Sequence, residues 1–367
     1  MIGWLVRTLP VVVGLLPFLP SVAGCGVSNG RDPSSSMTTG EAAPVAGSGG
    51  GTSRGEVVPV SSQAAATNPI NGRRAIGYLT QICDLGPRPT GSTGMAAQQR
   101  LLEQHFKSLG GEVRLQQFHI KHPLYGAAVP VANMIVHWHP KSKERILLCA
   151  HYDTRPLPDR DRKPAARRKG TFVGANDAGS GTAVLMELAH YMSSIKGRYG
   201  VDFLLVDAEE FIFKQAQTQR YFIGSEYFAS QYVKATLPYR YAKAVVLDMV
   251  GDRDLQIYLD RNSIWWRDTK FTTKEIWATA KRIGVQEFID RTHPRMKTPI
   301  KDDHLMLHNV GKIPTCEIID FDYPKFSRFD RDHNLFWHTE LDTPDKCSGD
   351  SLAKVGWVML EWIRTAQ

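Results

Sequence analysis

Residues 201–210 read VDFLLVDAEE, a short apolar run that ends in two adjacent carboxylates, Glu209 and Glu210. Apolar runs of this length predict a buried strand. Carboxylates at the end of such a strand are costly, because apolar surroundings disfavour their charged form. A metal ion would offset that cost, with one carboxylate binding the ion while its neighbour carries protons over the same site. Without a metal, the pair would simply begin a solvated turn.

Similar polar groups end or follow other strand-like runs, which favours the metal-ion interpretation. They are His151-Tyr152-Asp153, Asn176-Asp177, Leu247-Asp248 and Trp337-His338-Thr339. The carboxyl ends of parallel strands meet at one edge of a sheet, where the chemistry of such folds gathers. We therefore expect these side chains to converge at that edge.

Strand-like and helix-like segments alternate along most of the chain. Strands are expected at 112–119, 134–139, 146–150, 203–206, 244–247, 256–259 and 315–319, the sixth beside the fifth. Helices are expected at 76–85, 95–109, 182–192, 225–232, 274–282, 304–309 and 352–363. Buried strands that alternate with helices are typical of parallel sheets covered on both sides. The expected fold is α/β, a single domain with a central, mainly parallel twisted sheet covered by helices on both faces.

The candidate metal ligands form an ordered set of carboxylates and imidazoles. They are His151, Asp177, Glu210, Asp248 and His338. Neutral imidazole together with carboxylate suits Zn²⁺, and three protein ligands with an open fourth position are the catalytic arrangement. Any one of these residues taken alone is more often a packing or surface residue. Chance rarely gives all five in this order, so the set predicts a zinc site.

These motifs resemble those of the M28 zinc-dependent peptidases, which carry His-x-Asp, Asn/Asp-Asp-x-x-Ser-Gly, Glu-Glu, a later Asp and a terminal His-Thr. The corresponding segments here are 151–153, 176–181, 209–210, Asp248 and His338-Thr339. The resemblance spans roughly residues 70–363 and implies a zinc aminopeptidase-like fold. Within that superfamily, Lys301-Asp302-Asp303-His304 and the Trp before His338 are more similar to the glutaminyl-peptide cyclotransferases (glutaminyl cyclases).

For a cyclase, the resemblance implies one Zn²⁺ held by Asp177, Glu210 and His338. The ion would polarise the side-chain amide at the N-terminal glutamine of a peptide or protein, and the substrate's own α-amine would attack it. Glu209 would carry a proton from that amine to the departing ammonia. The product would be a peptide that begins with pyroglutamate.

Three further residues have roles that the resemblance implies. Asp248 and Asp302 would tune the proton affinity of Glu209, and Trp337 would form a wall of the substrate pocket. The chain also departs from the animal cyclases at three positions. Ala178 replaces a Ser, Gln215 replaces a pocket Trp and Glu317 replaces a His.

An aminopeptidase would use the same ligands differently. His151 and Asp248 would hold a second Zn²⁺, Asp177 would bridge the two ions, and Glu209 would deprotonate a water molecule. All the ligands of both enzymes are present, so the inventory of ligands does not separate the two reactions. A third possibility is a catalytically inactive binding domain, which would have no need of Glu209.

The N-terminal segment has the features of an export signal. Residues 1–24 contain an early Arg7 and a short apolar core, interrupted by prolines, that is too short to span a membrane. The junction Val22-Ala23-Gly24-Cys25 resembles the bacterial lipobox and implies a lipidated Cys25; the alternative is an ordinary cleavage site. Residues 25–68, rich in Ser, Gly and Ala, predict a disordered tether before a catalytic domain at 69–367.

These features predict an exported protein of the bacterial cell envelope, periplasmic or on the outer-membrane side, that meets the membrane only through its lipid anchor. We expect a monomer. The net charge is +8, and much of it lies in a loop at 155–169. A solvated loop is the favoured interpretation, with binding of phosphate or lipid head groups as the alternative. No aromatic residues interleave with these charges, so nucleic-acid binding is not expected.

Export permits disulfides, but the sequence does not pair the four cysteines that follow Cys25. Two of them, Cys149 and Cys316, are expected to be small buried residues of strands.

Overall fold

The computed structural model describes residues 67–214, 216–323 and 334–366. Its strands are β1 (Glu112–Lys121), β2 (Ala128–Trp138), β3 (Glu144–His151), β4 (Gly200–Val206), β5 (Arg240–Asp248), β6 (Ile257–Tyr258), β7 (Phe288–Ile289) and β8 (Thr315–Ile319). Its α-helices are α1 (Gly72–Asp84), α2 (Thr93–Ser108), α3 (Ala166–Lys169), α4 (Gly181–Met192), α5 (Ile223–Lys234), α6 (Arg261–Trp265), α7 (Lys270–Ile283), α8 (His304–Asn309) and α9 (Gly349–Thr365). A π-helical turn, η1 (Ala175–Ser180), precedes α4, and a 3₁₀ turn, η2 (Pro344–Lys346), precedes α9.

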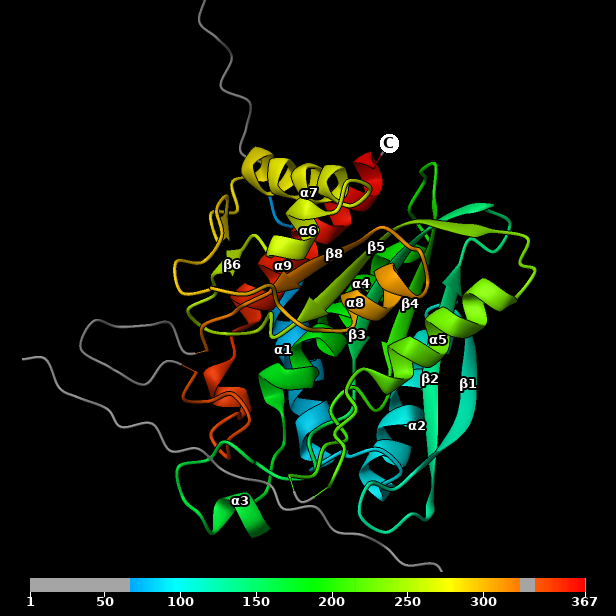
Figure 1. Ribbon diagram of the computed structural model, residues 1–367. Helices are drawn as coiled ribbons and strands as arrows, with labels where there is room; N and C mark the ends of the chain where they lie inside the picture. Colours follow the sequence, from blue (N-terminus) through cyan, green and yellow to red (C-terminus); the bar gives the residue numbers. More distant parts are fainter. Residues whose placement is uncertain (1–66, 215, 324–333, 367) are drawn as a thin grey trace, which may run out of the picture. The chain divides into compact units, whose positions relative to one another are not determined.

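Six strands form the central sheet in the order β1-β2-β4-β3-β5-β8 (Figure 1). Strands β4, β3, β5 and β8 run parallel to one another. Strand β2 is antiparallel to both of its neighbours, β1 and β4. The expected α/β fold is confirmed, and the parallel half of the sheet carries the candidate ligands.

Side chains of β3 alternate between two hydrophobic layers, because successive residues of a strand point to opposite faces. Ile146, Leu148 and Ala150 pack in the larger layer, which includes residues of α1, α2, α4, α7 and α9. Leu147 and Cys149 pack in the smaller layer with residues of α5 and α8. Helices therefore cover both faces of the sheet, as the sequence predicts (Figure 1).

The strand expected at 256–259 was placed wrongly. Its residues form the short β6, which pairs with β7 in a separate two-stranded sheet and does not lie beside β5 in the central one. Two short helices, α3 and α6, were not expected. Each is shorter than two helical turns, so neither gives a hydrophobic periodicity that a sequence can reveal.

Several expectations fall outside the described residues and remain predictions. They concern the signal segment 1–24, Cys25, most of the tether and Gln215. The four cysteines that are described lie buried as free thiols, which agrees with the expectation for Cys149 and Cys316. Among the described helices, none combines the length and the apolar character needed to cross a membrane.

Candidate metal centre

The candidate ligands come together at the carboxyl-terminal edge of the parallel strands. His151 and Asp248 are the last residues of β3 and β5, and Glu210 follows β4. Because these three strands are parallel, their ends lie side by side. Asp177 comes from η1, and His338 comes from the segment between β8 and η2. Distant parts of the chain thus meet at one edge, as expected.

One cluster contains Asp177, Glu210 and His338, all of them buried. The His338 Nε2 atom lies 3.2 Å from Asp177 Oδ2 and 3.2 Å from Glu210 Oε2. Ligand atoms held about 2.0–2.2 Å from a tetrahedral zinc ion stand about 3.3–3.6 Å apart. The spacing and the chemistry of these donors therefore fit a Zn²⁺ ion.

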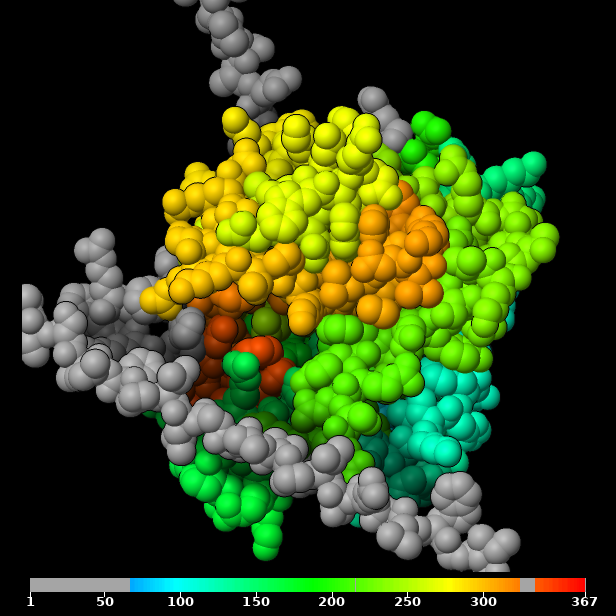
Figure 2. All heavy atoms as spheres, in the orientation of Figure 1, coloured from blue at the N-terminus to red at the C-terminus, as the bar shows by residue number. Residues whose placement is uncertain are grey.

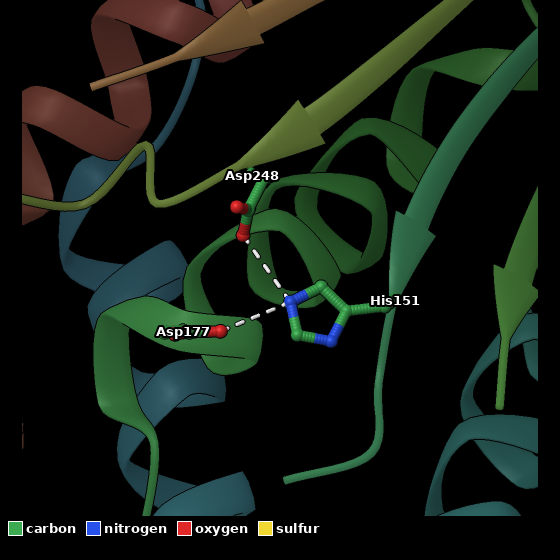
Figure 3. A group of neighbouring side chains, drawn as sticks. All are labelled: His151, Asp177 and Asp248. Carbon is green, nitrogen blue, oxygen red and sulfur yellow. Dashed lines mark hydrogen bonds and ion pairs between the residues drawn. The ribbon is translucent and has the colours of Figure 1, made fainter. Parts of the chain in front are cut away.

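A second cluster shares Asp177 with the first and adds His151 and Asp248 (Figure 3). The His151 Nε2 atom lies 3.1 Å from Asp177 Oδ1 and 3.2 Å from Asp248 Oδ1. Burial alone would raise the pKa of Asp177, but the two imidazoles outweigh burial and lower it. The two oxygens of Asp177 thus face two clusters, and the second also has the spacing of a zinc site.

Glu209 lies beside both clusters, with a ligand atom close to those of His151 and Glu210. The backbone N–H groups of Glu209 and Glu210 donate to the two carboxylate oxygens of Asp153, at 3.0 and 3.2 Å. Burial raises the pKa of Glu209 well above its ordinary value, and the carboxylates of Glu210 and Asp302 raise it further. A carboxyl group with a raised pKa is suited to accept and return a proton near neutral pH.

Asp302, which precedes α8, supplies one of the charges that act on Glu209. It is buried, and its Oδ2 atom has no hydrogen-bond partner among the described residues. Burial and the neighbouring Asp248 raise the pKa of Asp302. Asp248 contacts His151, and its charge is among the causes that raise the pKa of Asp302.

Trp337 is half-buried and packs against the ring of the neighbouring His338, with 4.2 Å between the ring centroids. The guanidinium of Arg160 lies 3.8 Å from the centroid of the Trp337 ring. The backbone N–H of Arg160 also donates to the carbonyl of His338, at 3.1 Å. The loop at 155–169 therefore contacts the site. The sequence analysis favoured a solvated loop and did not predict this contact.

The sequence analysis missed Arg155, whose side chain is buried against the first cluster. Its Nε atom lies 3.0 Å from Glu210 Oε2 and 3.2 Å from His338 Nε2. Its backbone N–H donates to the other oxygen of Glu210, at 2.8 Å. Arg155 was treated there only as one end of the basic loop, and no motif marks it. Its position two residues after the His-x-Asp segment was the one available signal.

Asp342 was also missed, although it holds the turn that carries Asp177. Its two carboxylate oxygens accept the backbone N–H groups of Asn176 and Asp177, at 2.8 and 3.2 Å. The hydroxyl of Tyr323 donates to the same carboxylate, at 2.8 Å. Burial, followed by the charge of Asp177, raises the pKa of Asp342 to about 7. A lone Asp in a turn gives no sequence signal for such a long-range contact.

The backbone is left-handed at three non-glycine residues that adjoin the candidate groups. Ala208, which precedes Glu209, has φ of 58°, Met249, which follows Asp248, has 46°, and His338 itself has 55°. Such residues cost free energy and persist where the surrounding structure holds them in place. Their clustering here fits a site in which the direction of each side chain is fixed.

Glu317, the residue that departs from the animal cyclases, lies on β8 and is fully buried. Its Oε2 atom lies 2.8 Å from Nδ1 of His304, the first residue of α8. Burial and then the charges of Asp302 and Asp248 raise the pKa of Glu317. His304 thus lies against a carboxylate whose pKa is raised by two acidic residues of the site.

Comparisons with known proteins point to one family. Residues 133–363 match the family model described as peptidase family M28. The crystal structure of Fimbriiglobus ruber glutaminyl cyclase is similar over 82% of this chain and 97% of its own, with 37% identical residues and a TM-score of 0.75.

Of two further relatives, one is named as a glutaminyl-peptide cyclotransferase and the other as an aminopeptidase precursor. A Drosophila melanogaster glutaminyl-peptide cyclotransferase is 23% identical over 301 residues, which cover 76% of this chain and 78% of that protein. The structure of a leucine aminopeptidase precursor from Bacteroides thetaiotaomicron matches 82% of this chain and 99% of its own, with 27% identity and a TM-score of 0.71.

Proposed function

The chain belongs to peptidase family M28, and we propose that it is a glutaminyl-peptide cyclotransferase that converts N-terminal glutamine into pyroglutamate and releases ammonia. The similarity to a bacterial glutaminyl cyclase, with 37% identity against 27% for the leucine aminopeptidase precursor, supports this reaction over peptide hydrolysis. The expected substrates are the N-termini of peptides and proteins.

The observation that carries the proposal is the burial of Asp302, whose charge acts on Glu209. A buried carboxylate oxygen without a hydrogen-bond partner is costly, unless it holds a proton or meets a donor from the substrate. An N-terminal glutamine brings donors of this kind, in its α-amine and its side-chain amide. The pair of carboxyl groups is thus suited to a reaction in which a proton moves from one substrate nitrogen to the other.

In the proposed reaction, the α-amine nitrogen forms a bond to the side-chain amide carbon, and the bond from that carbon to the amide nitrogen breaks. Glu209 accepts a proton from the attacking amine and returns it to the departing nitrogen, which leaves as ammonia. When bound, Zn²⁺ supplies Lewis-acid polarisation of the amide carbonyl. Trp337 lies against the ring of His338, where it is suited to bound the glutamine pocket.

We assign one Zn²⁺ to Asp177, Glu210 and His338. Three carboxylates, Asp177, Glu210 and Asp248, face the two clusters. The similarity to glutaminyl cyclases, for which the resemblance of the motifs implies one ion at Asp177, Glu210 and His338, supports a single ion.

Release of ammonia tests the proposal. Purified protein incubated with a glutamine-initiated peptide amide should release ammonia. The rate should fall to that of a blank without enzyme after chelation, and should return on addition of Zn²⁺. Ammonia at the blank rate in the zinc-loaded protein would contradict the proposal. A peptide that begins with asparagine is a matched control, because its shorter side chain cannot form the same five-membered ring.

A di-zinc aminopeptidase remains the second candidate, because one observation favours it. The cluster of His151, Asp177 and Asp248 has the same donor spacing as the first cluster (Figure 3). A second Zn²⁺ held there would be bridged to the first by Asp177. Metal analysis separates the two, since an aminopeptidase would hold two zinc ions and lose one in His151→Ala.

The location of the protein is also a proposal, supported by its N-terminal sequence alone. Residues 1–24 and Cys25 would direct export and lipidation, so that the catalytic domain acts in the cell envelope as a monomer on a tether. Expression in a bacterial host and fractionation test this. The wild type should appear with membranes and Cys25→Ala in the soluble fraction, and an equal distribution of both would contradict lipidation.

A further inference from the structure

A positively charged pocket of about 450 Å³ adjoins the metal centre. Its described lining combines the basic loop with the segment around His338. The lining residues are Asp159, Arg160, Arg162, Arg167, Lys214, Asn334, Leu335 and Thr339. Four cations and one carboxylate give this lining a net charge of +3 at neutral pH. Figure 2 shows the molecule hollowed where the red-orange segment meets the green ones.

Two of these cations are held in place by neutral carbonyl groups. Arg167 Nη1 donates to the carbonyls of Asp161 and Arg162, at 2.7 and 3.3 Å. Lys214 Nζ donates to the carbonyl of Asp159, at 2.5 Å. Hydrogen bonds to carbonyls fix a cation without cancelling its charge, which leaves the pocket attractive to an anion.

One carboxylate in the lining is shared among several cations. The oxygens of Asp159 lie 3.6 Å from Arg155 Nη1, 3.7 Å from Lys214 Nζ and 3.6 Å from His338 Nδ1. A single negative charge divided in this way does not neutralise the lining. The positive charges of Arg167 and Lys214 therefore remain available to a ligand.

The imidazole of His338 joins the pocket to the metal centre. Its Nε2 atom faces Asp177 and Glu210, whereas its Nδ1 atom faces Asp159 in the pocket wall. Arg160, another lining residue, covers a face of the Trp337 ring. An extended peptide spans about 3.3–3.6 Å per residue. A peptide whose first residue is at the metal centre therefore reaches the pocket with its second or third residue.

We propose that this pocket is a subsite for an acidic side chain at the second or third residue of the substrate, so that the enzyme favours acidic peptides. The proposal rests on the cyclase function proposed above. An Asp or Glu side chain there would meet Arg167 and Lys214, and would contribute an attraction that a neutral residue lacks. The basic loop then serves to select substrates.

The test compares the cyclisation of matched peptide amides that differ in one residue. The peptides are Gln-Glu-Ala-Phe-amide, Gln-Gln-Ala-Phe-amide, Gln-Lys-Ala-Phe-amide and Gln-Ala-Glu-Phe-amide, and amidation removes the competing terminal carboxylate. At low salt, kcat/KM for the better of the two glutamate peptides should exceed that for the neutral one by roughly threefold to fivefold, the range of an exposed ion pair. The lysine peptide should be the poorest, and added salt should shrink the differences.

Charge reversal in the pocket tests which residues produce the preference. Lys214→Glu should lower kcat/KM for the glutamate peptide and raise it for the lysine peptide, and Arg167→Gln should weaken the preference in the same direction. Lys196→Glu is the matched control, because Lys196 is exposed in the loop between α4 and β4, away from the carboxyl ends of the strands. This control should retain the preference of the wild type.

The outcomes separate the subsite from the reaction itself. Equal kcat/KM for all four peptides, or a preference unchanged in both Lys214→Glu and Arg167→Gln, would overturn the subsite and leave the cyclase function intact. If the neutral peptide releases no ammonia, then the cyclase function fails and the subsite fails with it.

Discussion

Glu209 combines two properties that a proton carrier needs. Its backbone is fixed by the carboxylate of Asp153, which accepts its N–H at 3.0 Å. Its pKa is raised by burial and by the carboxylates of Glu210 and Asp302. The fixed backbone holds the Glu209 carboxyl in position. The raised pKa moves the pH at which this carboxyl gains and loses its proton toward neutrality.

Replacement of Glu209 by Gln should abolish proton transfer while leaving the metal in place. We expect Glu209→Gln to lower kcat by about 10²–10⁴-fold, the usual contribution of general acid–base catalysis, because the amide accepts no proton. Zinc content should equal that of the wild type. Glu103→Gln on the surface of α2 is the control, and loss of zinc from Glu209→Gln would contradict the assigned role.

The pH dependence of the reaction should report the charge of Asp302. Glu209 must be deprotonated to accept a proton, so kcat/KM should rise with pH through its raised pKa. Asp302 is a negative neighbour wherever it is ionised, and there Asp302→Asn lowers the pKa of Glu209 and moves the rising limb to lower pH. The exposed Asp290→Asn serves as the control. An unmoved limb in Asp302→Asn would show that Asp302 carries no charge that acts on Glu209 at the pH of the limb.

Only some residues of the site could be predicted from the sequence. Glu209 and Glu210 were found because two carboxylates at the end of an apolar run need a physical reason. Arg155 and Asp342 were missed, because their partners lie more than fifty and more than one hundred and sixty residues away along the chain. Contacts of that range leave no local pattern.

At the scale of elements, the buried strands position the site. Leu148 is fully buried in β3, three residues before His151. Parallel pairing with β4 and β5 fixes the register of the three loops that follow these strands. The packing of β3 therefore supports the geometry of the ligands.

Truncation in this strand should be costly. We expect Leu148→Ala to lower the free energy of unfolding by about 2–5 kcal/mol, because it leaves a cavity between β3 and the helices of the larger layer. Leu124→Ala, at an exposed leucine between β1 and β2, should change it by less than about 0.5 kcal/mol. Denaturant unfolding of both variants checks this, and equal losses would contradict the assigned core.

The long strands and helices were predictable because their apolar spacing repeats over enough residues. The one strand neighbour that the sequence analysis predicted was wrong. Residues 256–259 have the composition of a strand, but composition does not reveal the partner, and β6 pairs with β7. The turn η1 also escaped prediction, since its conformation depends on the distant carboxylate of Asp342.

For the whole molecule, metal binding and folding should be coupled. Zn²⁺ binds the folded protein, so at about 100 times its Kd it should add about 2.7 kcal/mol of stability and raise Tm. His338→Ala removes a proposed ligand and should lose this response. Thermal unfolding with and without Zn²⁺ checks both proteins, and an equal rise in Tm for His338→Ala would place the ion elsewhere.

The products formed from two peptides test the proposed reaction most directly. The zinc-loaded protein is incubated with a glutamine-initiated peptide amide and an otherwise identical alanine-initiated one, and the products are analysed by mass. A cyclase should lower the mass of the first peptide by one ammonia, keep all its residues and leave the second peptide unchanged. Removal of the first residue from either peptide, with no loss of ammonia from an intact chain, would contradict the cyclase and establish an aminopeptidase.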